Sequence, residues 1–246
     1  MKVLGFISIM YGKEYLKESL LSIRDHVDKM VVAYTYNPSH GHTTTLKCPD
    51  SVDEIHAICS EVLGSKLIWD EKQSYNHEGE HRAVARKYAD GYDLILTIDA
   101  DEIFEPKEVQ TALQYAYTNP QRYYGIKGYV NFWRCFDFAC YDGFRPIRIE
   151  NLRNHNSQQN LECPLTIYHF STAQSEEITR YKYTAFGHAN ELKPNWLNGT
   201  FYAWDRTNQI KDLHCVAYNL WNAEPFDKTI LPDFLKQHIN YNKELI

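Results

Sequence analysis

Short apolar stretches alternate with amphipathic ones through the first half of the chain. Four apolar stretches are rich in β-branched or aromatic side chains and bounded by turn residues, which is typical of buried strands. They lie at Val3–Met10, Lys29–Tyr34, Lys66–Trp69 and Asp93–Ile98. Between and after them, helices are predicted over Glu14–Asp25, from Ser51 or Asp53 to Leu63, over Glu80–Ala89, and from Pro106 to Tyr117.

This β-α-β-α-β-α-β order predicts an α/β fold with a mostly parallel central sheet and helices on both faces. After residue 120 the pattern changes to aromatic-rich strands and loops. The predicted elements there are strands over Tyr123–Arg134 and Phe144–Glu150 and helices over Ser175–Thr184 and Pro232–Leu245; polar loops are predicted over Asn37–Asp50 and Asn151–Asn160. Because no repeat or linker interrupts the pattern, we expect a single domain, 1–246, with halves 1–120 and 121–246.

Composition and charge exclude several classes of protein. The 246 residues carry 26 basic and 32 acidic side chains, and the net charge of −6 argues against a generally basic nucleic-acid binder. None of the six cysteines forms a C-x-x-C pair, so we expect reduced thiols and a cytoplasmic protein. The N-terminus lacks the features of a signal peptide, and no apolar run approaches the ~20 residues that span a bilayer, so no membrane insertion is expected.

The strongest chemical signal is a D-x-D pair directly after the fourth predicted strand. Asp99 and Asp101 stand two residues apart, so an ideally continued strand would point both to one face. Ligands of parallel sheets bind beyond the carboxyl ends of the strands, and carboxylates buried there need a cation or another partner. Mg²⁺ and Mn²⁺ prefer oxygen ligands and often bridge to phosphates. The sequence therefore predicts a site for a metal ion and a diphosphate.

Ordered motifs over residues 1–190 resemble glycosyltransferases of the GT-A fold, in the large family 2 group. The similar segments are GFISIMYGKEYL at Gly5–Leu16, EGEHRAVA at Glu78–Ala85, IDADE at Ile98–Glu102 and YHF at Tyr168–Phe170. The resemblance implies a GT-A (Rossmann-like) sheet, a nucleotide-diphosphate sugar donor with a UDP-sugar favoured, and Mn²⁺ or Mg²⁺. It makes 1–120 the nucleotide-sugar-binding half and 121–246 an aromatic-rich acceptor-side half.

The resemblance also implies roles for individual residues. Donor binding falls to Tyr11, Asn76, Arg82 and Asp99, and metal binding to Asp99, Asp101 and His169. Tyr11 would help to hold the nucleobase, and the Arg82 guanidinium could balance diphosphate charge. The chain departs from the family pattern after the second strand, where Tyr34–Pro38 replaces the usual acidic pair. Base recognition by tyrosine stacking is one explanation, and the donor base stays open.

Transfer to an acceptor hydroxyl in an inverting reaction also needs a general base. Candidates lie in the segment Phe136–Gly143, and Asp142 is our choice of catalytic residue. The alternative is that Asp142 only forms the Asp-Gly turn with Gly143, because this pair is common in turns.

Two other functions are compatible with parts of the sequence. His77-Glu78-x-x-His81 matches the H-E-x-x-H helix of zinc metallohydrolases. Gly79 inside that helix and the charges of Glu80 and Arg82 argue against it. The second alternative is a non-catalytic nucleotide-sugar-binding module, against which the intact D-x-D pair argues.

The acceptor is either a glycan or small molecule, or a hydroxymethylated base in DNA, as for glycosyltransferases of the bacteriophage DNA-modifying kind. The DNA hypothesis comes from residues 122–153, where basic and aromatic side chains interleave and could grip phosphates and an extruded base. The basic members are Arg122, Lys127, Arg134, Arg145, Arg148 and Arg153. An aromatic-rich sugar-binding lobe explains the same stretch, and we rank glycans and small molecules first.

Overall fold

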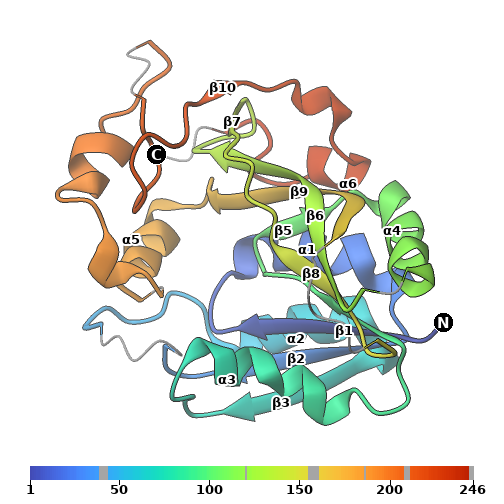
Figure 1. The fold of residues 1–246 in the computed structure, drawn as a ribbon. Helices are drawn as coiled ribbons and strands as arrows, with labels where there is room; N and C mark the ends of the chain where they lie inside the picture. The colour runs from blue at the N-terminus through green and yellow to red at the C-terminus, as the bar shows by residue number, and fades with distance from the viewer. Residues whose placement is uncertain (39–43, 120, 155–160, 186, 208–210, 244–246) are drawn as a thin grey trace.

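A mixed sheet runs through the molecule (Figure 1). The computed structural model describes residues 1–38, 44–119, 121–154, 161–185, 187–207 and 211–243. Four parallel strands stand side by side in the order β3-β2-β1-β4. Their bounds are Val3–Ile9 for β1, Lys29–Thr35 for β2, Leu67–Lys72 for β3 and Leu94–Thr97 for β4. All four predicted strands are therefore present, and they form the predicted parallel part of the sheet.

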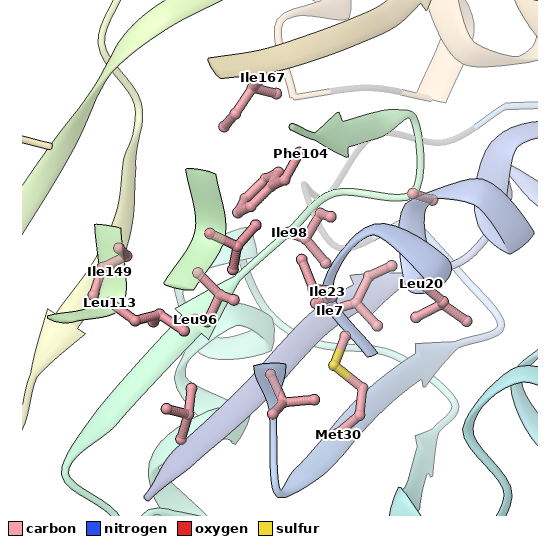
Figure 2. Close-up of a cluster of buried hydrophobic side chains, with 14 of the residues drawn as sticks. Ile7, Leu20, Ile23, Met30, Leu96, Ile98, Phe104, Leu113, Ile149 and Ile167 are labelled. Carbon is pink, nitrogen blue, oxygen red and sulfur yellow. The ribbon is translucent and has the colours of Figure 1, made fainter. Parts of the chain in front are cut away.

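Helices cover both faces of these strands. Three helices, α1 (Lys13–Ile23), α2 (Val52–Leu63) and α4 (Pro106–Thr118), share one apolar cluster with one face of the sheet. Figure 2 shows part of this cluster, with Ile7 of β1 near Leu20 of α1. The other face packs Leu4 and Phe6 with Ala85, which lies in the 3₁₀ segment directly after α3 (Glu78–Arg82). The predicted α/β fold with helices on both faces is confirmed.

The helix predicted from Ser51 or Asp53 begins with a capping box at Ser51. The Ser51 hydroxyl accepts from the Glu54 backbone N–H at 3.2 Å, and the Glu54 carboxylate accepts from the Ser51 N–H at 3.1 Å. This reciprocal pair satisfies two amide donors at the start of α2. The predicted helix over Glu80–Ala89 differs in form, because α3 (Glu78–Arg82) is one short α-helix that continues as the 3₁₀ segment η3 (Ala83–Tyr88). Two further 3₁₀ turns follow α1 and α2, at Arg24–His26 and Gly64–Lys66.

The second half of the chain extends the sheet with mainly antiparallel pairs. β8 (Ile147–Asn151) joins β4 to β6 (Tyr123–Trp133), which in turn pairs with β7 (Phe138–Cys140), and β7 pairs with β10 (Glu224–Pro225). β9 (Leu161–Thr172) runs parallel to β6 and also pairs with β5 (Glu102–Phe104). The predicted strand over Phe144–Glu150 begins only at Ile147, because Phe144 lies in the preceding loop.

The C-terminal part wraps around the end of the sheet. It contains α5 (Glu176–Ala185), short turns of helix at Ala189–Glu191, Leu197–Phe201 and Lys228–Ile230, and α6 (Asp233–Lys236). Aromatic side chains form a core of their own there. Its large members are Trp133, Tyr183, Trp196, Phe201, Trp204 and Trp221. Much of the aromatic content is therefore packing rather than ligand binding.

The predicted helix over Pro232–Leu245 is wrong beyond Lys236. His238 stacks on Tyr15 at 4.5 Å between ring centroids, and its Nε2 donates to the Glu14 carbonyl at 2.8 Å. These tertiary contacts with α1 favour turns over a continued helix. Residues 244–245 of this prediction, 39–43 of the first polar loop and 155–160 of the second lie outside the described residues. Within the described part of the chain, no helix has the length and apolar character needed to cross a bilayer.

Candidate active site

A cavity of about 450 Å³ opens beyond the carboxyl ends of the parallel strands. Its lining comes from the turns after β1 and β4, from α3 and α5, from the strands β6, β8 and β9, and from the loop before β8. Five of the residues singled out in the sequence line it together: Tyr11, Arg82, Asp99, Asp101 and His169. The cavity therefore lies where ligands of open α/β sheets bind.

The D-x-D pair reaches this cavity through a turn, not through an extended strand. β4 ends at Thr97, and Ala100 and Asp101 form a turn before β5 begins at Glu102. The start of α1 packs tightly against this turn. Gly12 has a φ of +115°, and a Cβ at this position would lie only 2.9 Å from the Ala100 Cβ. Glycine is therefore required here both by its backbone conformation and by the close approach.

Asp99 lies between two guanidinium groups. Its Oδ1 accepts from Arg82 Nη1 at 3.2 Å, and its Oδ2 accepts from Arg148 Nη2 at 2.8 Å. Burial alone would raise the pKa of Asp99, but Arg148 and then Arg82 outweigh it and hold the pKa below its usual value. The same interaction with Asp99 raises the pKa of Arg82. Asp99 is therefore a carboxylate at neutral pH, and it fixes two cationic side chains at the cavity.

Asp101 and His169 lie next to each other in the cavity wall. Asp101 Oδ2 accepts from Lys182 Nζ at 2.7 Å and from Gln174 Nε2 at 2.9 Å, while Oδ1 lies 3.6 Å from His169 Nε2. His169 Nδ1 donates to Asn131 Oδ1 at 2.8 Å, which leaves Nε2 as the basic nitrogen of the neutral ring. Burial lowers the pKa of His169, against the effect of Asp101. The imidazole is thus neutral and presents a lone pair toward Asp101.

A buried carboxylate, that of Glu102, holds side chains that line the cavity. Glu102 has no exposed surface and accepts from Arg148 Nε at 2.7 Å and from the Tyr129 hydroxyl at 2.7 Å. It also faces His169 across the β5–β9 pair. Sequence reasoning missed Glu102, Asn131 and Lys182. Of the three, only Glu102 could have been found from the sequence, because it directly follows Asp101. Strand pairing brings Asn131 to the site, and the packing of α5 brings Lys182.

The charges of the cavity lining balance. Among its described residues, Arg82, Arg148 and Lys182 oppose Glu78, Asp99 and Asp101 when imidazoles are counted as neutral. The lining therefore has no surplus positive charge to hold a nucleoside diphosphate. The Asp101 carboxylate oxygen and the His169 Nε2 suit a divalent cation, and Asn131 orients the imidazole as partners of metal-bound histidines commonly do. Asp101 and His169 thus supply two possible ligands, and the described residues include no cluster of three. Mn²⁺ or Mg²⁺ held here would take its remaining ligands from phosphate oxygens or water.

Two of the predicted site residues do not line this cavity. Asn76 lies outside it, where its amide and backbone N–H both donate to the Glu80 carboxylate at 2.9 Å. Asp142 lines a neighbouring cavity, and its two oxygens accept from Trp221 Nε1 at 2.6 Å and from the Phe144 N–H at 2.7 Å. Asp142 therefore forms the turn that the alternative interpretation described, and it also stands next to the candidate site.

The two histidines of the H-E-x-x-H match are not arranged as zinc ligands. α3 begins at Glu78, so His77 precedes the helix in extended conformation, and its Nδ1 accepts from the Glu80 N–H. His81 is buried, stacks on Tyr75, and donates through Nε2 to the Ala33 carbonyl at 2.7 Å. His77 Nδ1 and His81 Nε2 therefore have other partners. The described residues also include no cluster of three ligating side chains.

The basic side chains of residues 122–153 do not form one surface. Arg122 pairs with Glu150, Arg145 with Glu162, and Arg153 lies over the Tyr117 ring. Arg148 points into the candidate site, and Arg134 is buried, where it donates to the Phe201 and Trp204 carbonyls. These contacts engage five of the six basic residues that motivated a DNA acceptor.

Comparisons with known proteins give distant similarities. No protein-family model matches the chain, and no curated protein matches it. TarS of S. aureus in complex with UDP-GlcNAc is 20% identical over 52% of this chain and 34% of its own, with a TM-score of 0.39. Glucosyl-3-phosphoglycerate synthase from Mycobacterium tuberculosis in complex with Mn²⁺, UDP-glucose and phosphoglyceric acid is 16% identical over 54% and 44%, with a TM-score of 0.34. The chain thus spans less than half of these solved chains, and the similarity is too remote to assign a function.

Proposed function

We propose that the protein is a glycosyltransferase that moves a sugar from a nucleoside-diphosphate donor, with UDP favoured, to an acceptor hydroxyl. The single observation that carries the proposal is the pairing of Asp101 and His169 at the carboxyl ends of parallel strands, in a charge-balanced cavity that three basic side chains enter. A divalent cation bound there would neutralise the diphosphate as it leaves.

Side chains of the protein would bind the diphosphate and the nucleobase of the donor. Arg82 and Arg148, oriented by Asp99, face the space where the diphosphate would lie and can donate to its oxygens. Tyr11 lines the cavity beside them and offers a ring to the nucleobase. Asn76 is not part of the lining, so its role in this proposal is to hold the start of α3 through Glu80.

In the transfer step, the acceptor oxygen forms a bond to the anomeric carbon as the bond from that carbon to the diphosphate breaks. The acceptor proton goes to a base, for which we propose the Asp142 carboxylate. The hydrogen bonds from Trp221 and Phe144 use one lone pair on each Asp142 oxygen, so each oxygen can still accept a proton. In Asp142→Asn, the amide oxygen can still accept the hydrogen bond from Trp221. If Asp142 is the base, the turnover of this variant should fall about 10²–10⁴-fold.

The experiment is a thermal-shift titration of the full chain with Mn²⁺, Mg²⁺, Zn²⁺ or EDTA, each alone and together with UDP, GDP, ADP or dTDP. A ligand at 100 times its dissociation constant adds about 2.7 kcal/mol of stability. We expect a rise in melting temperature only when a nucleotide and a divalent cation are both present. Asp101→Asn should remove that rise. Asp233→Asn should retain it, because Asp233 is exposed and is not part of the cavity lining.

Other outcomes identify what is wrong. An equal rise in EDTA would contradict the metal assignment, and no rise with any nucleotide would overturn the donor. A rise in melting temperature with Zn²⁺ alone would support the alternative of a zinc metallohydrolase that uses His77 and His81. Nucleotide binding without release of UDP from UDP-glucose or UDP-N-acetylglucosamine, in water or with any acceptor, would favour a non-catalytic binding module.

A further inference from the structure

A second cavity of about 350 Å³ adjoins the candidate active site. The two cavities share five residues in their walls: Tyr129, Phe144, His169, Lys182 and His188. The second cavity continues along β6 and β9 toward α5 and the segment 214–221. A group bound in it would therefore lie beside a donor bound in the first.

Rings form much of its wall. Tyr129 and Phe144 stand edge to face at 5.7 Å between centroids, and Trp221 packs against His214 at 4.7 Å. Trp221 adopts a φ of +65°, a conformation that bulky residues rarely adopt. It is fixed by the hydrogen bond from its indole N–H to Asp142. Backbone strain of this kind is concentrated at functional sites, where surrounding contacts hold it.

Two hydrogen-bond donors belong to the same wall. Asn131 is 2% exposed, and its Nδ2 has no hydrogen-bond partner among the described residues because only its oxygen is used, by His169. His214 Nδ1 accepts from the backbone N–H groups of Val216 and Ala217, so the proton of the neutral ring is on Nε2. A buried donor without a partner is costly, and a ligand oxygen would relieve that cost.

The charged groups of this wall are already engaged. Lys182 donates to Asp101 and to Ser171, the oxygens of Asp142 accept from Trp221 and Phe144, and Glu191 pairs with His188. Rings, neutral donors and paired charges together suit an uncharged ring that carries hydroxyl groups. The volume is near the lower end of the ~300–1,000 Å³ typical of small-molecule sites, so it suits one ring and not an oligomer.

We infer that the second cavity binds the acceptor as a single pyranose residue, with one hydroxyl directed toward the first cavity. This inference rests on the proposed function for its role as acceptor, although the binding site stands on its own geometry. A nucleobase from DNA fits less well, because the acidic side chains of Asp142 and Glu191 lie at this cavity and would repel a phosphate backbone.

Saturation-transfer NMR tests the site directly, since it detects weak binding without turnover. The probes are the methyl pyranosides of glucose, galactose, mannose and N-acetylglucosamine, with 5-hydroxymethyl-2′-deoxycytidine as the comparison. Val216→Phe should block the cavity, because Val216 is a half-buried part of its wall. Val52→Phe is the matched control: Val52 is also half-buried but lines neither cavity.

We expect saturation transfer to at least one pyranoside with the native protein and with Val52→Phe, and a loss of at least fivefold with Val216→Phe. UDP binding should be the same in all three proteins. Transfer only to the deoxynucleoside, to none of the probes, or equally in Val216→Phe would overturn the inference. If UDP bound to none of the proteins while the pyranoside pattern held, the proposed function would fail and the sugar site would stand.

Discussion

At the scale of single residues, the candidate site is a set of charges that hold one another in place. Asp99 has its low pKa because two guanidinium groups approach it. Arg148 stays in position because the buried Glu102 carboxylate accepts from it, and the Tyr129 hydroxyl in turn donates to Glu102. The sequence predicted Asp99, Asp101 and His169, since a strand end and a family-like motif marked them. It could not predict Lys182 or Asn131, because their roles depend on where α5 and β6 pack.

Glu102 should matter more for stability than an exposed glutamate with the same kind of partner. Glu102→Gln weakens a buried pair with Arg148, which is expected to cost about 3 kcal/mol. Glu162→Gln breaks the half-exposed pair with Arg145 and should cost less than about 1 kcal/mol. Urea unfolding of both variants measures the difference. Equal midpoints would show that Arg148 is held mainly by Asp99.

The lowered pKa of His169 predicts a pH effect with a definite sign. The unfolded chain takes up a proton near pH 6.5, before the folded chain does, so acidification through this range favours unfolding. His169→Gln lacks this effect. The stability of the native protein should therefore fall relative to His169→Gln between pH 7.5 and 5.5, measured by chemical unfolding. The lowered pKa values of Asp99 and Asp101 act only below about pH 4, outside this window. A constant difference between the two proteins would contradict the burial of a neutral imidazole.

At the scale of elements, hydrophobic pattern and capping chemistry were sufficient for the parallel strands and their helices. They were insufficient for β9, of which only Tyr168–Phe170 was noticed. Pro164 interrupts that strand and cannot donate to a neighbour, which argues against a strand from sequence alone. The structure accommodates it through a shift in the β6–β9 register between Ile126 and Gly128. α6 was overestimated for the opposite reason, since contacts of His238 with α1 override a weak helical pattern.

The start of α1 should be sensitive to a single methyl group. Gly12→Ala would place a Cβ against Ala100 and displace the turn that carries Asp101, so we expect UDP affinity in Mn²⁺ to fall at least tenfold. Gly91→Ala is the control, because Gly91 also has a positive φ but open space around it. Both variants carry the conformational cost of a left-handed residue, about 1–2 kcal/mol. Calorimetric titration with UDP measures the affinity of both variants. An equal loss in Gly12→Ala and Gly91→Ala would show that the loss comes from lower stability and not from the displaced turn.

At the scale of the whole molecule, the two halves of the chain share one core. The largest apolar cluster contains Ile7 and Leu96 from the first half, and Tyr124, Ile149 and Ile167 from the second (Figure 2 labels four of these five). The candidate site is divided in the same way, because Asp101 comes from the first half and His169 and Lys182 from the second. The nucleotide-binding and acceptor-side halves of our proposal therefore share one apolar core and one candidate site.

This sharing predicts that residues 1–120 do not fold alone. Without β8 and β9, the edge of β4 and the whole of β5 lose their partners, and the face that packs on α4 is exposed. The expressed fragment should show no cooperative thermal transition, whereas the full chain should unfold in one transition whose calorimetric and van't Hoff enthalpies agree. A cooperative transition in the fragment would mean that the first half is a domain in its own right. The second half would then have been built onto an independent nucleotide-binding unit, and His169 would enter the site by docking of one domain on another.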